Sequence, residues 1–226
     1  MPAPSGSVWS SRRKKGGESA IVKVTSRKLH QHGLILLDGQ KYAVQEDILK
    51  EKEILKFLTA QKGDVGAQRA VKYLDFFKSN SNFYFVMEHG GHMLFDFVVR
   101  VHRYIEGGKL DLAEWRQFVR VLFVQIVEAV QFIHRHGVCH YDISLENLLI
   151  NDVEVVLDHD GKIKFCADSI DVKLCDFGYA HSVTAYIMSL YPLKFIDFFW
   201  RCDLTENIMI FVALKSHDFL SLEIYS

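Results

Sequence analysis

The sequence predicts an α+β protein in which a β-rich N-terminal part precedes a mainly helical part. Three observations support this class. Short alternating or apolar runs dominate the first ninety residues, and Asp38-Gly39 separates two of them. A long amphipathic segment follows at 110–136, and two short apolar runs come after it, at 148–150 and 172–174. A period of two with Asp-Gly indicates strands and hairpins, whereas a period of 3.6 indicates a helix.

The composition is typical of a globular protein with a substantial core. Of the 226 residues, 49% are hydrophobic and 24% are charged, and the formal net charge is −1. This balance favours neither a nucleic acid nor an anionic membrane as the main partner. The sequence has no signal-type N-terminal core and no uncharged apolar stretch of about 18 residues. Four scattered cysteines are too few for a disulfide scaffold, so we expect a reducing setting, either cytoplasmic or nuclear.

Residues 1–18 are rich in Ser, Gly, Pro and charge, which predicts a disordered tail. Arg12-Arg13-Lys14-Lys15 in this tail is open to two interpretations. It is either a nuclear import signal or a basic run that only keeps the tail solvated.

The first half of the remaining chain contains the signals of a small sheet and one helix. Residues 20–24 alternate and predict a first strand. Leu34–Leu37 and Lys41–Val44 flank Asp38-Gly39 and predict a hairpin. The segment 46–61 has apolar residues at helical spacing, and 83–87 is an apolar and aromatic run that suits a buried strand.

The second half is organised around the predicted helix at 110–136. Its apolar residues recur on one face, and Gly137 just past its end suits a helix C-cap. We expect 148–150 and 172–174 to pair as strands. The connection between them, 151–171, contains Asp158-His159-Asp160-Gly161 and predicts a turn with short strands of its own.

Two motifs in this half carry chemical information. His140-Tyr141-Asp142 is followed by Asn147, five residues after the aspartate, and by Asp176-Phe177-Gly178 a further 29 residues on. Together they resemble the catalytic loop and the metal-binding tripeptide of the eukaryotic protein kinases. The resemblance implies that Asp142 accepts the proton of a substrate hydroxyl, and that Asn147 and Asp176 hold Mg²⁺ on ATP.

The resemblance also implies a two-lobe fold for most of the chain. Residues 19–90 would form the small β-rich lobe with the hinge, in which the hairpin of Leu34–Leu37 and Lys41–Val44 would be the second and third strands. Residues 91–180 would form an incomplete, mainly helical lobe. Residues 181–226 have no clean period and would be an atypical tail, so the chain looks truncated after Asp-Phe-Gly. The implied activity is transfer of the γ-phosphoryl group of ATP to a protein Ser or Thr hydroxyl, with a protein substrate that the sequence does not identify.

The residues that would contact the nucleotide follow from the same resemblance. Ala43 and Leu149 would contact the two faces of the adenine, and Met87 would guard the pocket behind it. The backbone of Glu88 and Gly90 would bond the adenine at the hinge. Glu51, on the predicted helix at 46–61, would pair with a lysine that holds the phosphates.

Several positions depart from the family pattern. The expected glycine-rich loop is replaced by 25–33, which contains a single glycine, and Gln45 stands where the lysine is expected. Tyr141 and Ser144 stand where the catalytic loop usually has arginine and lysine. Loss of that arginine removes the usual docking charge for a phosphorylated loop, so we expect no such control.

Three hypotheses therefore remain open. The chain is an ATP-dependent protein kinase, or it is a pseudokinase or fragment that binds nucleotide or protein without transfer. The third hypothesis is a zinc site, since four potential ligands cluster in the sequence: His134, His136, Cys139 and His140.

Overall fold

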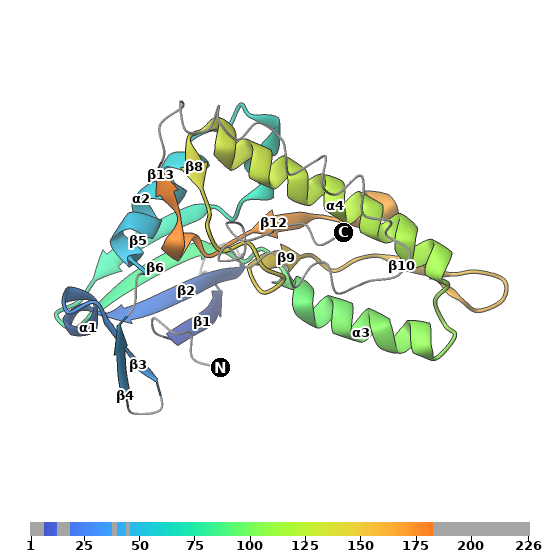
Figure 1. Ribbon diagram of the computed structural model, residues 1–226, viewed down its shortest axis with the longest axis horizontal. Coiled ribbons are helices and arrows are strands. Elements are labelled where there is room, and N and C mark those ends of the chain that lie inside the picture. The colour runs from blue at the N-terminus through green and yellow to red at the C-terminus, as the bar shows by residue number, and fades with distance from the viewer. Residues whose placement is uncertain (1–6, 13–18, 38–39, 44–45, 183–226) are drawn as a thin grey trace, which may run out of the picture.

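The computed structural model describes residues 7–12, 19–37, 40–43 and 46–182, and these form a β-rich lobe beside a mainly helical lobe (Figure 1). The β-rich lobe contains a four-stranded antiparallel sheet in the order β1-β2-β6-β5. β6 confirms the buried strand that the sequence predicts at 83–87. The strands are β1 (Ser7–Arg12), β2 (Ser19–Ser26), β5 (Tyr73–Lys78) and β6 (Asn82–Glu88).

β2 is an internal strand of this sheet and not its first strand. Ser7–Arg12 forms β1, which pairs with β2 from Ser7↔Val24 to Arg12↔Ser19. The prediction of a disordered tail is therefore wrong for these six residues, because pairing with the edge of β2 satisfies backbone groups of a polar segment. The rest of that tail, including Arg13, Lys14 and Lys15, lies outside the described residues.

The helix predicted at 46–61 is α2 (Ile48–Thr59). It begins after Asp47, whose Oδ1 accepts the N–H groups of Leu49 at 2.9 Å and Lys50 at 3.3 Å. One face of α2 is buried and packs against β5 and the core of the lobe. That face consists of Ile48, Glu51, Ile54, Leu55 and Leu58.

The predicted hairpin forms, but it does not join the sheet. β3 (Leu34–Leu37) and β4 (Gln40–Ala43) pair with each other in a separate two-stranded sheet. The short helix α1 (Arg27–Gln31) redirects the chain after β2, and the hairpin projects away from the four-stranded sheet (Figure 1). The expectation that these runs are the second and third strands of the lobe is wrong, because β6 occupies the place beside β2. Asp38 and Gly39 lie outside the described residues.

The helical lobe is built around α4 (Leu112–Arg135), which confirms the helix predicted at 110–136. Gly137 follows it with a φ of 68°, as its C-cap role requires. By length and composition α4 is apolar enough to cross a membrane, with a mean hydropathy of 1.2. Its apolar face instead packs against η1 (Val65–Arg69), β12 (Val172–Leu174), β8 (Val138–Cys139) and β11 (Ile163–Phe165), as expected of a core helix.

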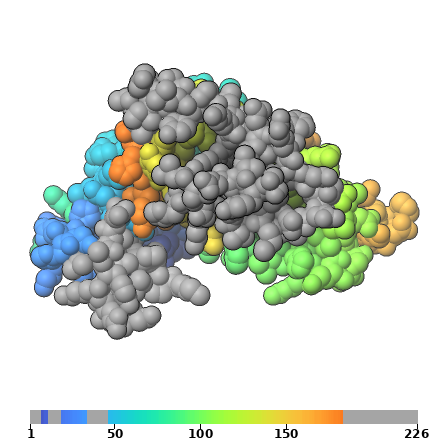
Figure 2. Space-filling view, viewed as in Figure 1, coloured from blue at the N-terminus to red at the C-terminus, as the bar shows by residue number. Residues whose placement is uncertain are grey.

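A three-stranded sheet, ordered β12-β9-β7, lies between α4 and α3 (Leu94–Glu106) (Figure 1). β9 (Leu148–Ile150) pairs with β12 over the residues predicted from the sequence, and β7 (His92–Met93) lies on the other side of β9. The connection forms the expected short hairpin, β10 (Val155–Leu157) with β11, followed by η2 (Ala167–Ser169). This hairpin projects at the end of the molecule opposite α1 (Figure 2).

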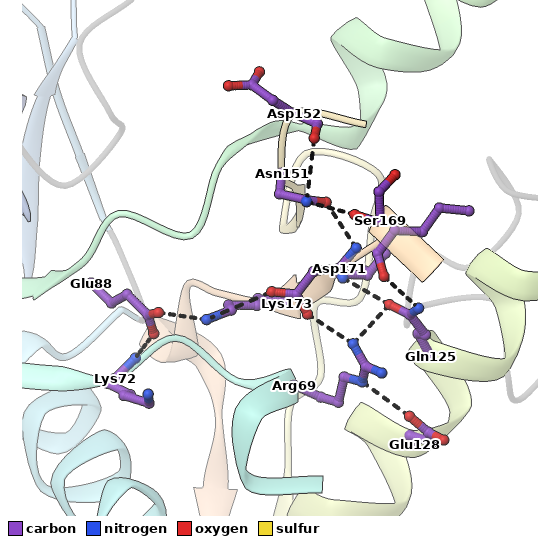
Figure 3. Close-up of polar contacts among 12 residues, drawn as sticks. Arg69, Lys72, Glu88, Gln125, Glu128, Asn151, Asp152, Ser169, Asp171 and Lys173 are labelled. Atoms are coloured by element: carbon purple, nitrogen blue, oxygen red, sulfur yellow. Dashed lines mark hydrogen bonds and ion pairs between the residues drawn. The ribbon is translucent and has the colours of Figure 1, made fainter. Parts of the chain in front are cut away.

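A polar network connects the two lobes through Arg69, at the end of η1 (Figure 3). Its guanidinium donates to Glu128 at 3.0 Å, to Gln125 at 2.8 Å and to Asp171 at 2.8 Å. Buried Gln125 in turn accepts the N–H of Val172 at 2.9 Å. The network therefore fixes η1 against α4 and the start of β12.

Residues 183–226, which include most of the predicted tail, lie outside the described residues.

Candidate active site

The side chain of Lys23 is surrounded by carboxylates from three segments of the chain. Its Nζ lies 3.0 Å from Glu51 Oε2 on α2, 3.0 Å from Asp176 Oδ1 and 3.5 Å from Glu46 Oε2. The Lys23 side chain is only 7% exposed, and that of Glu51 is 1% exposed. Such buried charges are tolerated when they are paired and hydrogen-bonded, as they are here.

Local structure explains why these groups meet. Lys23 and Ile21 lie on the same face of β2, because successive side chains of a strand alternate, and Lys23 is in register with buried Phe85 of β6. Glu51 lies on the buried face of the first turn of α2. Asp176 has a φ of 60° and starts the turn into η3 (Phe177–Tyr179), so the chain changes direction at this residue.

The electrostatics divide the cluster into distinct roles. Burial by itself would lower the pKa of Lys23, but Glu51, Asp176 and Glu46 outweigh it and raise that pKa above its ordinary value. Burial raises the pKa of Glu51 to about 7, against the opposing effect of Lys23. Burial also opposes ionisation of Asp176, but the Lys23 charge outweighs it and keeps that pKa below its ordinary value. Lys23 and Asp176 are therefore charged at neutral pH, whereas the pKa of Glu51 lies near it.

Asp142 and Asn147 are held together on the loop after β8. Asn147 Nδ2 donates to Asp142 Oδ2 at 2.8 Å and to the Asp142 backbone oxygen at 2.8 Å. Both amide hydrogens are used in this way, which leaves Oδ1 as the side-chain atom of Asn147 that is suited to a cation. The Asp142 carboxylate is thus oriented by its partner and half-buried.

His140 joins this loop to the segment that carries Asp176. Its Nδ1 accepts the N–H of Asp142 at 3.3 Å, and its Nε2 lies 3.0 Å from the backbone oxygen of Cys175. This pattern assigns the neutral Nε2–H tautomer, and burial, the largest influence, lowers the pKa of His140 accordingly. The Cys175 N–H also donates to the Asn147 backbone oxygen at 2.9 Å. Residues that are 29 positions apart are therefore brought to one site.

The end of β6 and the residues after it place the expected hinge residues beside β9 and β12. Met87 is buried, and it is in register with Ile21. Gly90 is packed so closely that a Cβ there would lie 2.8 Å from Leu149 Cδ1. The Glu88 side chain bonds Lys173 Nζ at 2.5 Å and the N–H of Lys72 at 3.1 Å (Figure 3), which anchors the hinge to β12 of the other lobe.

Ala43 is not brought to this site, because it belongs to the separate hairpin of β3 and β4. Its side chain lies outside the described residues. Ile21 takes the place predicted for Ala43, since it is two residues before Lys23 on the same face of β2.

The lysine that pairs with Glu51 is Lys23, so the expectation of this lysine at position 45 is wrong. Gln45 itself lies outside the described residues. The signal was present in the sequence as Ala20-Ile21-Val22-Lys23, which is similar to the Val-Ala-Ile-Lys strand of the kinases. A lysine inside an alternating apolar strand is unusual because strand interiors rarely bury an unpaired charge. Glu46, the third carboxylate beside Lys23, was also missed.

Tyr141, which replaces the usual arginine, has a φ of 65°, and its ring lies edge-on to His181 with the ring centroids 5.6 Å apart. His181 Nε2 also lies 3.3 Å from Lys50 Nζ on α2. An aromatic contact therefore connects the loop after β8 to β13 (His181–Ser182) at this position. Over the described part of the chain, no group of three or more His, Cys, Asp or Glu residues is arranged to hold a metal ion, so the zinc hypothesis has no support.

A strand lysine paired with a helix glutamate, an Asp–Asn pair after a long helix, and an Asp-Phe-Gly turn facing the lysine define a protein-kinase-like site between two lobes. The comparisons agree with this class. The family model of the protein kinase domain matches residues 5–190. The chain belongs to the protein kinase family.

Relatives and a solved structure support the assignment. The chain is 32% identical over 180 residues to the carbon catabolite-derepressing protein kinase of Candida albicans, which covers 74% of this chain and 23% of that protein. It is 31% identical over 159 residues to the serine/threonine-protein kinase pim-2 of Danio rerio, covering 67% of this chain and 46% of that one. A crystal structure of a kinase domain superposes with a TM-score of 0.57 at 19% identity, covering 82% of this chain and 50% of that one, which supports the fold. The chain spans less than half of the length of both curated relatives.

Proposed function

We propose that this chain binds ATP with Mg²⁺ and transfers the γ-phosphoryl group to a Ser or Thr hydroxyl of a protein. The observation that carries the proposal is the Lys23–Glu51 pair at 3.0 Å beside Asp176. A lysine held by a helix glutamate is the arrangement that kinases use to position phosphates. The similarity to serine/threonine kinases supports the choice of substrate hydroxyl.

The residues present fit the metal and the nucleotide. Mg²⁺ prefers oxygen ligands and is usually held by one or two protein groups together with substrate phosphates. Asp176 offers an ionised carboxylate that is 39% exposed, and Asn147 offers an amide oxygen whose companion nitrogen is already bonded to Asp142. Gly90 lies against Leu149 at the hinge, so the two residues expected to contact the adenine are close together.

Each residue then has one task in the reaction. Lys23 stabilises the phosphate charge, and bound Mg²⁺ would neutralise the charge that develops on the transferring group. Asp142 accepts the proton of the substrate hydroxyl while that oxygen forms the new bond to phosphorus and the bond to the ADP oxygen breaks. Asn147 donates a hydrogen bond to the Asp142 carboxylate and keeps it oriented. This orientation matters because a general base must lie within hydrogen-bond reach of the proton it accepts.

The test is transfer of labelled phosphate from ATP to Ser- and Thr-containing peptides by purified chain. We expect Asp142→Asn to remove transfer while ATP binding stays, since the change removes the base but keeps the shape. Glu146→Gln, at an exposed neighbour on the same loop, is the matched control and should keep transfer. Equal transfer by Asp142→Asn and the unchanged chain would contradict the assigned role.

The second candidate is a pseudokinase that binds nucleotide without transfer. Ser144 and Tyr141 favour it, because neither supplies the positive charge that the catalytic loop usually places near the aspartate. Binding of ATP without any transfer by the unchanged chain would support this candidate.

A further inference from the structure

Glu46 is a third carboxylate facing the lysine of the site, in addition to the two that the kinase pattern explains. It lies in the segment just before α2, and its side chain is 8% exposed. Its Oε2 is 3.5 Å from Lys23 Nζ. An ammonium group has three hydrogens to donate, and Glu51, Asp176 and Glu46 match that number.

Packing holds Glu46 in this position. A Cβ at position 178 would lie 3.0 Å from Glu46 Cγ, so the buried Gly178 makes room for the glutamate. The N–H of Asp47, the next residue, faces the Gly178 backbone oxygen at 3.4 Å. The start of α2 and the Asp-Phe-Gly turn therefore enclose the Glu46 side chain between them.

The charges around Lys23 do not balance. Three carboxylates face one ammonium, and the phosphates of a nucleoside triphosphate would bring further negative charge to the same atom. Asp176 can turn its charge to the cation that accompanies the phosphates, and Glu51 anchors Lys23 to α2. Glu46 lies before α2 and outside the Asp-Phe-Gly turn, and its carboxylate faces the third hydrogen of the Lys23 ammonium.

We propose that Glu46 is an affinity-determining residue that occupies Lys23 in the empty site and weakens the binding of nucleoside triphosphates. This inference rests on the proposed function, because it takes Lys23 to be the phosphate-binding lysine. It predicts that loss of the Glu46 charge tightens binding, whereas loss of the Glu51 charge loosens it. The opposite signs separate a competitor for Lys23 from an anchor of Lys23.

The experiment compares the unchanged chain with Glu46→Gln, Glu51→Gln and Glu53→Gln by calorimetric titration with ATP·Mg²⁺ and with adenosine. Glu53 is an exposed glutamate on α2 that pairs with Lys52, so it is the matched control. We expect Glu46→Gln to tighten ATP·Mg²⁺ binding about tenfold, because one charge that competes within a few ångströms is removed. Adenosine has no phosphate, so its affinity should not change, and Glu53→Gln should alter neither affinity.

The outcomes separate the two proposals. If the unchanged chain binds both ligands and Glu46→Gln binds ATP·Mg²⁺ no more tightly, the role of Glu46 is wrong while the nucleotide site stands. If adenosine binding tightens as much as ATP·Mg²⁺ binding, the effect does not pass through Lys23 and the role is again wrong. If neither the unchanged chain nor Glu46→Gln binds either ligand, both the proposed function and the role of Glu46 are wrong.

Discussion

Substitution of Lys23 by methionine tests the buried charge cluster through the free energy of unfolding. The change keeps most of the side-chain volume but leaves the carboxylates of Glu51, Asp176 and Glu46 without their shared cation, at sites 3.0–3.5 Å from the missing nitrogen. Removing one partner of a buried ion pair costs about 3–5 kcal/mol, because the other charge stays buried without compensation. We expect a loss of this size at pH 8 in urea denaturation.

The loss of folding stability caused by Lys23→Met should be smaller at lower pH, and this direction follows from the pKa of Glu51. The pKa of Glu51 is about 7 in the folded chain against an ordinary value of 4.5, so stability from this group falls as the pH rises from 4.5 through about 7. Without Lys23 the folded pKa rises further and the fall extends to higher pH. The difference between Lys23→Met and the unchanged chain should therefore be smaller at pH 5.5 than at pH 8. The change is at most about 1.4 kcal/mol, because only the part of the rise between about 7 and 8 is felt at pH 8.

The matched control is Lys78→Met, at an exposed lysine on β5. It should change stability by less than about 0.5 kcal/mol at both pH values. A loss below about 1 kcal/mol for Lys23→Met, or a loss that is greater at pH 5.5 than at pH 8, would refute the reasoning.

Three further predictions concern the frame of the site. Gly91→Ala should cost several kcal/mol in denaturant unfolding, because its φ is 115° and a Cβ would collide with the backbone of β9. Gly108→Ala, at a glycine with a φ of 67° and open space around it, should cost about 1–2 kcal/mol. Equal costs of the two variants would argue against the close contact at the hinge. Arg69→Ala should lower the free energy of unfolding by about 2–3 kcal/mol, because its charged hydrogen bonds are lost. Arg120→Ala, at an exposed arginine, should leave stability nearly unchanged. A similar small effect of both substitutions would argue against the network between the lobes. Burial lowers the pKa of His140 from 6.5, so the contribution of this histidine to stability is present above that pH and is lost as the pH falls. His140→Gln should therefore flatten the fall in the free energy of unfolding between pH 7 and 5.5. The same slope of stability against pH in the variant and the unchanged chain would contradict a buried neutral histidine.

Local patterns were sufficient for part of the fold. The long apolar face of α4 and the runs that form β9 and β12 each determine their own conformation, so the sequence predicted them to within two residues. The hairpin of β3 and β4 also formed as predicted, but its turn chemistry carries no information about which sheet edge it joins. The choice of sheet edge depends on long-range packing, and for this reason the prediction that Ala43 lies at the adenine was wrong.

The difference between local patterns and long-range packing also explains which site residues could be predicted from the sequence. Asp142, Asn147 and Asp176 belong to short motifs, and the hydrogen bonds of His140 and Cys175 bring those motifs together. Lys23 belongs to no motif longer than its own strand, and its role depends on Glu51 of α2 reaching its Nζ. Glu46 meets Lys23 only because the Asp-Phe-Gly turn of the other lobe lies beside the start of α2, which no local pattern reveals.

The central claim, that Lys23 is the lysine that contacts nucleotide phosphates, can be measured by labelling. An ATP analogue with a reactive acyl-phosphate group transfers its acyl group to a lysine amine within reach of the phosphates, and mass spectrometry identifies the modified residue. We expect Lys23 to be acylated, and excess ATP·Mg²⁺ to suppress this modification while exposed Lys78 stays unaffected. Labelling of Lys41 in place of Lys23, or labelling of Lys23 that excess ATP·Mg²⁺ does not suppress, would contradict the account.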